Sequence, residues 1–437
     1  MQVTTRVGNT LLVLGAAIML SACASNPPPT DPTARVWRMA VADAKTPTIR
    51  IWDLEEREEV AVLTTHSPAR LRAGLDEMEV AAIQGKSGQV QMLHMGLKRQ
   101  DHGDHQHWVT GKPVLSAPIL SGLKPSHANP GNGRLAVFYD GEGLARIYNP
   151  AAPGETDVIR TNASHHGLAV PLPRMRYLVS VAAEEGSLPR ATQLMDAKGN
   201  VLQSSPPCTL QHGDATHGAW HLFGCANGLL VWHDAAQLGS GAFILVPYPK
   251  TSGARMVRTL LQSPVSGSFV GNFGADGLLF ITLQPQDELP RLAPITLPAK
   301  LLHFAWDSQH PQTAYALLES GVLMTIDSST QQVLGQTQAI PVWTDDASDT
   351  ANRPPKPQLA VAEGRIVVSD ARTGLVHVLR TKDLKQTDTL RVGGQPFSLA
   401  LRSVDLSHLK RVGRRENYWI RNEVGSGGLA LISIHGC

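Results

Sequence analysis

The sequence predicts an all-β chain folded as a β-propeller of about eight blades, with seven blades as the alternative. The chain has 437 residues and is 42% hydrophobic, so it carries enough apolar material for a packed core. Its apolar runs are short, and Gly, Asp, Asn and Pro separate them. No long stretch shows the 3.6-residue period of an amphipathic helix. The runs recur about every 45 residues, which is the spacing of four-stranded propeller blades.

The repeating unit is an apolar strand, a turn that contains Gly or Asp, and a second apolar strand. Such a turn suits a hairpin because Gly and Asp tolerate positive φ. Units of this kind lie at residues 80–95, 134–149, 220–234, 267–283, 312–327, 363–381 and 417–434. We expect one more unit at residues 170–201.

The first predicted strands, at residues 35–54, lack a clear inner partner. We expect the C-terminal end of the chain to supply a closing strand there, which would remove a free sheet edge. A pair of β-sandwiches is the alternative fold, but it fits the regular spacing less well.

The N-terminus has the pattern of a bacterial lipoprotein signal. The apolar run LLVLGAAIML, residues 11–20, follows Arg6 and ends in LSAC. A short apolar run behind a positive charge indicates a secretion signal rather than a membrane span. We therefore expect a signal peptide at residues 1–22 and lipidation of Cys23. A plain secretory signal with an incidental cysteine is the alternative.

The remaining organisation follows from composition. Residues 23–33 are rich in proline and predict an extended tether behind the lipidated cysteine. Residues 34–437 are expected to form a single propeller domain. Ala24, not Asp, follows the lipidated residue, which in a Gram-negative cell resembles the pattern for the outer membrane. We expect a lipid-anchored protein in the periplasm, at the outer membrane.

The charge and motif content exclude several function classes. The net charge is +2 and there is no polybasic run, so nothing predicts nucleic-acid binding. No G-x-S-x-G nucleophile motif and no phosphate-binding Gly-rich loop is evident. A propeller hydrolase with a central divalent ion is the enzymatic alternative, but such sites need carboxylates and amides where this chain offers histidines. We expect a monomer that is not an enzyme.

Cysteine use fits an exported protein. Cys208 and Cys225 flank a predicted turn and are the candidate disulfide. Closing such a loop contributes about 3 kcal/mol in the chain-entropy model. Two buried free thiols are the alternative. Cys437 is left over, either as a free thiol or as a metal ligand.

The stretch KRQDHGDHQHWVT, residues 98–110, is a candidate metal site. It contains His102, Asp104, His105 and His107, and neutral imidazole and carboxylate are ligand types that zinc takes. The stretch lies between two predicted units, so we expect a loop rather than a core strand. In an extended chain alternate histidines point the same way. A solvated polar loop is the alternative.

Other histidines fall just before predicted inner strands, and the loops that enter those strands converge at one end of a propeller channel. They are His66, His127, His165, His166, His212, His217 and His303. A single histidine in such a loop is more often bonded to backbone than to metal. Three or four in equivalent positions can reach one zinc ion, with nearby groups orienting the rings. Asp104 and Asp214 are expected to act as ligands or as orienting groups.

Four segments carry a family resemblance. They are DHGDHQHW, GLKPSHANPGNGRLAVFYDGEGLARIY, HHGLAVPLPRMRYLVSV and CTLQHGDATHGAWHLFGCANGLLVW. Together they resemble the periplasmic zinc metallochaperones of the AztD type, most clearly over residues 101–232. The resemblance implies a zinc-binding β-propeller that passes Zn²⁺ to the solute-binding protein of a zinc ABC importer.

By position, the resemblance implies a set of metal-site candidates: His102, His105, His107, His127, His165 or His166, and His212. The cysteines of the candidate disulfide also fall at matching positions. The functional prediction is a zinc metallochaperone or zinc store in the cell envelope, which releases metal near pH 5–6 as its imidazoles protonate. The alternative is a lipoprotein scaffold that binds protein partners without tight metal.

Overall fold

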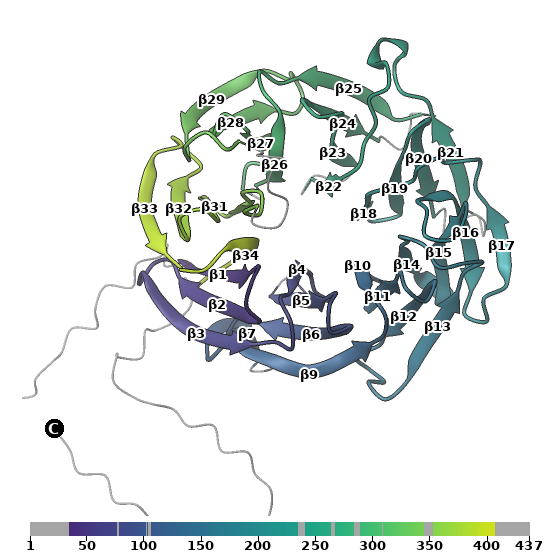
Figure 1. Ribbon diagram of the computed structural model, residues 1–437, viewed down its shortest axis with the longest axis horizontal. Helices are drawn as coiled ribbons and strands as arrows, with labels where there is room; N and C mark the ends of the chain where they lie inside the picture. The colour runs from purple at the N-terminus through teal and green to yellow at the C-terminus, as the bar shows by residue number, and fades with distance from the viewer. Residues whose placement is uncertain are drawn as a thin grey trace, which may run out of the picture.

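The computed structural model describes residues 35–76, 78–101, 103, 106–234, 241–263, 267–283, 289–307, 309–344 and 353–406, apart from the side chains of Gln106 and His107. Eight four-stranded antiparallel sheets stand around a central axis (Figure 1). The predicted eight-bladed β-propeller is confirmed. Within the described residues, no helix has the length and apolar character needed to cross a membrane.

Each blade runs from an innermost strand at the channel to an outermost strand at the rim. In that order, blade 1 consists of β34 (Pro396–Asp405), β1 (Arg35–Asp43), β2 (Thr48–Asp53) and β3 (Glu58–Thr64). Blade 2 consists of β4 (Arg70–Ala73), β5 (Glu79–Gln84), β6 (Gln89–His94) and β9 (Val114–Ser121). Blade 3 consists of β10 (Pro125–Gly131), β11 (Arg134–Tyr139), β12 (Leu144–Tyr148) and β13 (Thr156–Arg160). Blade 4 consists of β14 (Ala169–Leu172), β15 (Arg176–Ala182), β16 (Pro189–Asp196) and β17 (Val201–Ser204).

The other four blades follow the same order. Blade 5 consists of β18 (Asp214–His217), β19 (Trp220–Cys225), β20 (Gly228–His233) and β21 (Ala242–Val246). Blade 6 consists of β22 (Leu260–Gln262), β23 (Ser268–Asn272), β24 (Gly277–Thr282) and β25 (Arg291–Thr296). Blade 7 consists of β26 (Leu301–Trp306), β27 (Thr313–Leu318), β28 (Val322–Asp327) and β29 (Val333–Gln338). Blade 8 consists of β30 (Leu359–Ala362), β31 (Arg365–Asp370), β32 (Leu375–Arg380) and β33 (Gln386–Arg391). Two short 3₁₀ turns lie at Pro173–Met175 and Lys250–Ser252.

The repeat units expected between residues 80 and 381 became the second and third strands of blades 2 to 8. These strands are buried almost throughout, because both of their faces pack against neighbouring blades. In β11, for example, every residue after Arg134 is buried. The outermost strand β25 instead contains only exposed and half-buried residues, as a strand at the solvated rim should. The core therefore lies between the blades, in apolar clusters shared by neighbouring sheets.

The ring closes through strands from the two ends of the described chain. β34 pairs antiparallel with β1 from Arg35 opposite Asp405 to Asp43 opposite Pro396. A C-terminal segment thus supplies the missing inner strand of blade 1, as predicted. The segment is residues 396–405, whereas the repeat unit expected at residues 417–434 lies outside the described residues. With this pairing made, β1 no longer has a free edge toward the channel.

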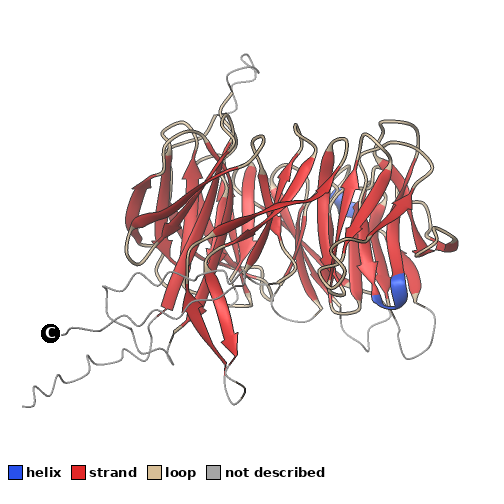
Figure 2. Cartoon of the chain, turned by 90° about the horizontal axis from the view of Figure 1, so that it is seen from below, coloured by secondary structure: helices blue, strands red, loops and turns tan. Residues whose placement is uncertain are grey.

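The histidine-rich stretch was predicted to be a loop, and the structure differs. β7 (Leu97–Asp101) and β8 (Gln106–Thr110) form a separate two-stranded hairpin, inserted between the third and fourth strands of blade 2. Leu97 at its base is buried in a small apolar cluster with Met78 and Val404, whereas the other residues of β7 are exposed. The hairpin is the strand pair that projects from one face of the ring in Figure 2.

Closure of the ring generates a stability prediction. Leu401 on β34 is 4% exposed and packs in an apolar cluster between blades 1 and 8. Leu401→Ala is expected to lower the free energy of unfolding by about 2–5 kcal/mol, because it leaves a cavity at the closing strand. Chemical denaturation measures this change. The control Leu334→Ala, at a site that is 59% exposed, should change stability by less than about 0.5 kcal/mol. Equal effects of the two substitutions would contradict the closing role.

Candidate metal centre

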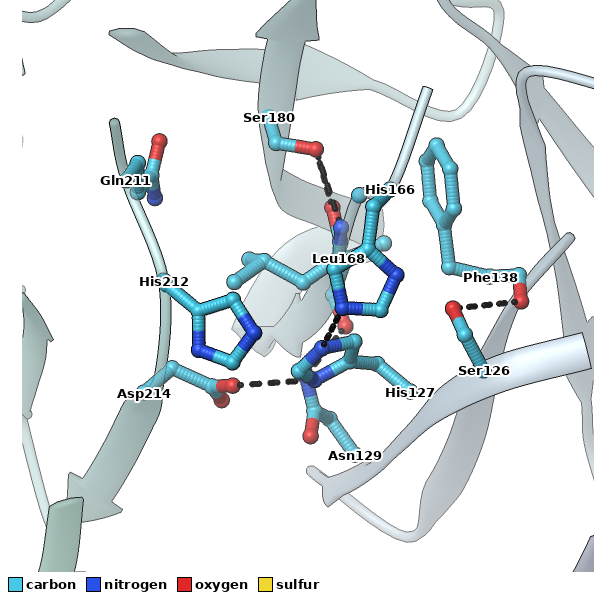
Figure 3. Close-up of polar contacts among 12 residues, drawn as sticks. Ser126, His127, Asn129, Phe138, His166, Leu168, Ser180, Gln211, His212 and Asp214 are labelled. Atoms are coloured by element: carbon cyan, nitrogen blue, oxygen red, sulfur yellow. Dashed lines mark hydrogen bonds and ion pairs between the residues drawn. The ribbon is translucent and has the colours of Figure 1, made fainter. Parts of the chain in front are cut away.

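Three histidines from neighbouring blades meet at the wall of the central channel. His127, His166 and His212 each offer a ring nitrogen, and these nitrogens lie within 4.8 Å of one another. Figure 3 shows the three rings turned toward a common point. All three side chains are half-buried. The sequence named each of them, but only the ring of blades brings them together.

Their positions follow from the order of the strands. His127 lies near the start of β10, the inner strand of blade 3. His166 lies in the segment between β13 and β14, and His212 in the segment between β17 and β18. Both segments lead from an outer strand of one blade to the inner strand of the next. They therefore reach the same face of the ring, beside the channel.

Asp140 orients His166. Its Oδ2 lies 2.6 Å from Nδ1 of His166, and its Oδ1 accepts a hydrogen bond from the hydroxyl of Ser126. A carboxylate accepts, so Nδ1 of the neutral ring carries the proton and Nε2 presents its lone pair. A histidine that donates its second ring nitrogen to a carboxylate is the common arrangement around protein-bound metals.

The turn that carries Asp140 depends on Gly143. Gly143 has φ of 62°, and a Cβ there would lie 2.5 Å from the carbonyl oxygen of Ala163. Its own carbonyl accepts a hydrogen bond from the backbone of Thr161 at 2.9 Å. A side chain at this position would therefore push apart the turn of blade 3 and the segment that leads to His166.

A backbone carbonyl orients His212. Nδ1 of His212 lies 2.7 Å from the carbonyl oxygen of Arg258. Because a carbonyl only accepts, the neutral ring again carries its proton on Nδ1 and leaves Nε2 free. Desolvation by burial is the main cause that lowers the pKa of His212, although the bond to Arg258 acts in the opposite direction. The ring therefore stays neutral to a lower pH than an ordinary histidine.

His127 is held less tightly. Its Nδ1 lies 3.7 Å from Oδ1 of Asp214, and its Nε2 lies 3.3 Å from Nε2 of His166. Asp214 thus faces the side of the ring away from the cluster, which is the place of an orienting group. The sequence alone leaves open whether Asp214 is a ligand or an orienting group.

The geometry fits one zinc ion. Two nitrogens bound tetrahedrally at about 2.0–2.1 Å from an ion lie about 3.3 Å apart. The Nε2 atoms of His127 and His166 stand at that separation. The nitrogen of His212 lies within 4.8 Å of both, so a small ring movement completes a three-nitrogen set. A fourth position would remain open toward the channel, whose cavity has a volume of about 1200 Å³.

His165 lies apart from this cluster although it neighbours His166. It is 1% exposed, and its two ring nitrogens lie 2.8 Å from the carbonyl of Ala163 and 2.9 Å from the hydroxyl of Ser180. Both nitrogens are thus occupied within the fold. Its ring also packs edge-on against Phe138. The sequence left His165 and His166 as alternatives, and the structure places only His166 at the cluster.

The histidine-rich hairpin is rooted on the opposite face of the ring. Connections between the third and fourth strands of a blade lie at the far end of the strands from His127 and Asp140. Strands of six residues such as β5 and β6 separate the two faces by roughly 20 Å. His107 belongs to β8, and His102, Asp104 and His105 lie outside the described residues. Cys23 and Cys437 lie outside them as well.

Two features of the site escaped sequence reasoning. Asp140 had no signal of its own, because an Asp followed by Gly in a hairpin has the pattern of an ordinary turn residue. The carbonyl of Arg258 belongs to the backbone and depends on the packing of blade 5 against blade 6. The other candidates His66, His217 and His303 are not members of the described cluster.

A disulfide braces the segment that carries His212. Cys208 and Cys225 are bonded to one another, with their Cα atoms 5.1 Å apart, and both are fully buried. Cys225 ends β19, and the backbone N–H of His212 donates to the carbonyl of Gly224 at 2.9 Å. The segment is thus tied to the second strand of blade 5 at two neighbouring points.

Comparison with known proteins finds a relative along most of the chain. The zinc chaperone AztD of Citrobacter koseri is 29% identical over 394 residues, which cover 89% of this chain and 90% of that protein. This chain is a homologue of AztD. The crystal structure of AztD from Citrobacter koseri matches with a TM-score of 0.77 at 27% identity, over 85% of this chain and 99% of that one. The structure of apo AztD from the same organism matches with a TM-score of 0.75 at 26% identity, again over 85% of this chain and 99% of that one.

Two further comparisons add only the fold or no match. Dihydro-heme d1 dehydrogenase NirN matches with a TM-score of 0.55 at 12% identity, over 87% of this chain and 76% of that one, which concerns the fold alone. No protein-family model matches the chain. The likeness to AztD therefore rests on the full-length alignment and on the shared propeller.

The disulfide generates a second prediction. The double variant Cys208→Ala and Cys225→Ala is expected to lose about 3 kcal/mol of unfolding free energy, because the unfolded chain is no longer cross-linked. Denaturant unfolding of the oxidised wild type and the variant measures the difference. Reduction should destabilise the wild type and leave the variant unchanged. A variant as stable as the oxidised wild type would show that the bond adds nothing to the fold.

Proposed function

We propose that this protein binds one Zn²⁺ ion through His127, His166 and His212 and carries it in the cell envelope. The observation that supports this proposal is the convergence of three imidazoles in which Nδ1 of two is held by a fixed acceptor. Their Nε2 lone pairs then face one point, which is the arrangement that zinc requires. Homology to a protein described as a zinc chaperone supports the same function.

In this proposal the ion is cargo, and the site carries no reaction. A set of three protein ligands leaves a coordination position to which an accepting protein can add its own ligand before the histidines let go. The acceptor that we propose is the solute-binding protein of a zinc ABC importer. The lipobox at Cys23 supports a lipid-anchored form in the periplasm, at the outer membrane. Nothing in the arrangement requires more than one copy of the chain.

The direct test is the metal content of the purified protein and zinc titration after chelator treatment, against a micromolar competitor. The wild type is expected to bind about one Zn²⁺ ion at the channel, and His127→Ala, His166→Ala and His212→Ala should each abolish tight binding. The removal of one ligand from three leaves too few for zinc. His310→Ala is the control, because His310 bonds Asp307 away from the cluster.

A variant with alanine at His102, His105 and His107 separates the two histidine groups. If this variant retains the tightly bound zinc ion, that ion is bound at the channel. The loss of a second, weaker zinc ion together with the hairpin histidines would be compatible with the proposal. Failure of the wild type to bind stoichiometric zinc would refute it. The protein would then be a propeller scaffold with structural histidines.

Asp140→Asn tests the orienting bond. An amide carries no charge and can turn its N–H₂ toward Nδ1, so the His166 ring loses its fixed tautomer. Zinc affinity is expected to fall about 10- to 100-fold while the fold is kept. Asp307→Asn breaks a similar histidine–carboxylate pair elsewhere and should leave zinc affinity unchanged. Competitor titration of both variants gives the comparison, and equal affinities would exclude an orienting role for Asp140.

Zinc affinity is also expected to depend on pH. Metal binds neutral imidazole, so affinity should fall as the pH drops into the range in which histidines protonate. The lowered pKa of His212 means that its protonation adds to this loss only at lower pH. A plot of log affinity against pH should therefore steepen toward acid. Competitor titrations between about pH 5 and 7.5 measure the slope, and a flat profile would contradict histidine ligation.

A further inference from the structure

The wall of the central channel carries an excess of positive charge. The cationic residues that line the cavity are Arg70, Arg72, Lys86, Arg258, Lys300 and Lys356, whereas its carboxylates are Asp214 and Glu319. Glu319 pairs with Lys300 at 3.6 Å, and Asp214 lies beside His127. The remaining cations are left without a neutralising partner on the described wall. The chain as a whole has a net charge of only +2, so the positive charge is concentrated at this wall.

Two of these cations, Arg70 and Arg72, stand side by side on one strand. They lie two residues apart on β4, the inner strand of blade 2, and both side chains are exposed while Leu71 between them is buried. Alternate residues of a strand share a face, so both guanidinium groups point into the channel, with their Cα atoms about 6.6 Å apart. Within the described part of the chain, neither forms an ion pair with a carboxylate. Arg72 donates one hydrogen bond, to the carbonyl of Leu71 at 3.1 Å.

The surroundings of Arg72 leave its charge uncompensated. Although solvent in the cavity reaches its side chain, protein surrounds it on the other sides, and this desolvation together with the neighbouring Arg70 lowers its pKa. His303, which lines the same cavity on β26, has its pKa lowered to about 4 by desolvation and then by Arg72. The neutral imidazole of His303 thus adds a polar group to the wall without adding repulsion.

We propose that the channel binds a small, multiply charged oxyanion between Arg70 and Arg72. A guanidinium group presents a planar fork of N–H donors that matches a carboxylate or phosphate in two-point contact. Two such forks on one strand face fit an anion with more than one charge. The cavity of about 1200 Å³ accommodates a small polycarboxylate or inorganic phosphate with its hydration water.

The other cations support this site from a distance. Lys86, Arg258 and Lys356 line the same cavity, and within the described residues none of them pairs with an acid. Like charges along a low-dielectric cleft focus the field and raise the local concentration of anions. The same field disfavours a free dication, so a bound anion would also offset the repulsion that Zn²⁺ meets at the histidine cluster. That consequence rests on the proposed function, whereas the anion site itself does not.

The test is calorimetric titration of the chelator-treated full-length protein with citrate and, separately, with inorganic phosphate at low ionic strength. Wild type is expected to bind citrate, phosphate or both with about one ion per chain, and added salt should weaken binding. Arg70→Gln and Arg72→Gln should each weaken it about tenfold or more, since each removes a charged two-point contact. Arg391→Gln, at an exposed position on the outermost strand β33, is the matched control and should change nothing.

Comparing citrate with phosphate identifies the chemical class of anion that the site binds. Binding of citrate alone indicates a polycarboxylate, and binding of phosphate alone or equally indicates a phosphate site. The proposal fails if neither anion binds, or if Arg391→Gln weakens binding as much as Arg72→Gln. Unchanged circular dichroism in the Arg70 and Arg72 variants excludes loss of fold as the cause.

A variant with alanine at His127, His166 and His212 keeps the two proposals apart. It is expected to lose zinc and to bind the anion as the wild type does. Loss of anion binding in this variant would place the anion at the histidines rather than at β4 and overturn the proposed position. A wild type that binds anion but no zinc would refute the zinc function and leave the anion site standing.

Discussion

The antiparallel pairing of β34 with β1 is the constraint on which the rest of the structure depends. It joins Arg35 to Asp405 and Asp43 to Pro396, residues more than 350 positions apart along the chain, into one sheet. Each blade buries its second and third strands only against its neighbours, so an open ring would expose two apolar faces and a free strand edge. Closure removes both and sets the position of every inner strand around the channel. The site inherits its geometry from this closed ring, since its three histidines belong to segments that enter blades 3, 4 and 5.

The candidate metal centre shows how a rigid scaffold can prepare a ligand set. The rings of His166 and His212 are each fixed at Nδ1, one by the carboxylate of Asp140 and the other by the carbonyl of Arg258. His127 has a longer contact to Asp214 and is the least restrained of the three. Two preset ligands and one adjustable ligand suit a carrier, because binding then needs little rearrangement and release has a ring that can move first.

The two histidine groups of this chain differ in their structural setting. The channel cluster stands on inner-strand connections that are tied down by a disulfide and by turns of the neighbouring blade. The hairpin of β7 and β8 leaves the opposite face of blade 2 and pairs only with itself. The cations that line the channel stand mostly at the face of the cluster, in segments that lead into inner strands or in the turn after β5. The cluster and the root of the hairpin therefore lie at opposite faces of the ring.

The sequence by itself determined the fold class, the approximate blade count and the strand pairs of most blades, because short apolar runs and Gly turns are local patterns with a regular period. It also named His127, His166 and His212 and the pair of cysteines. It did not decide between His165 and His166, since neighbouring residues on a bent segment point in directions that only packing sets. Only the tertiary structure revealed the orienting roles of Asp140 and of the Arg258 carbonyl. It also showed that Arg70 and Arg72 line the same cavity as the histidine cluster. These contacts join different blades, and the closed ring, rather than any local pattern, brings such residues together.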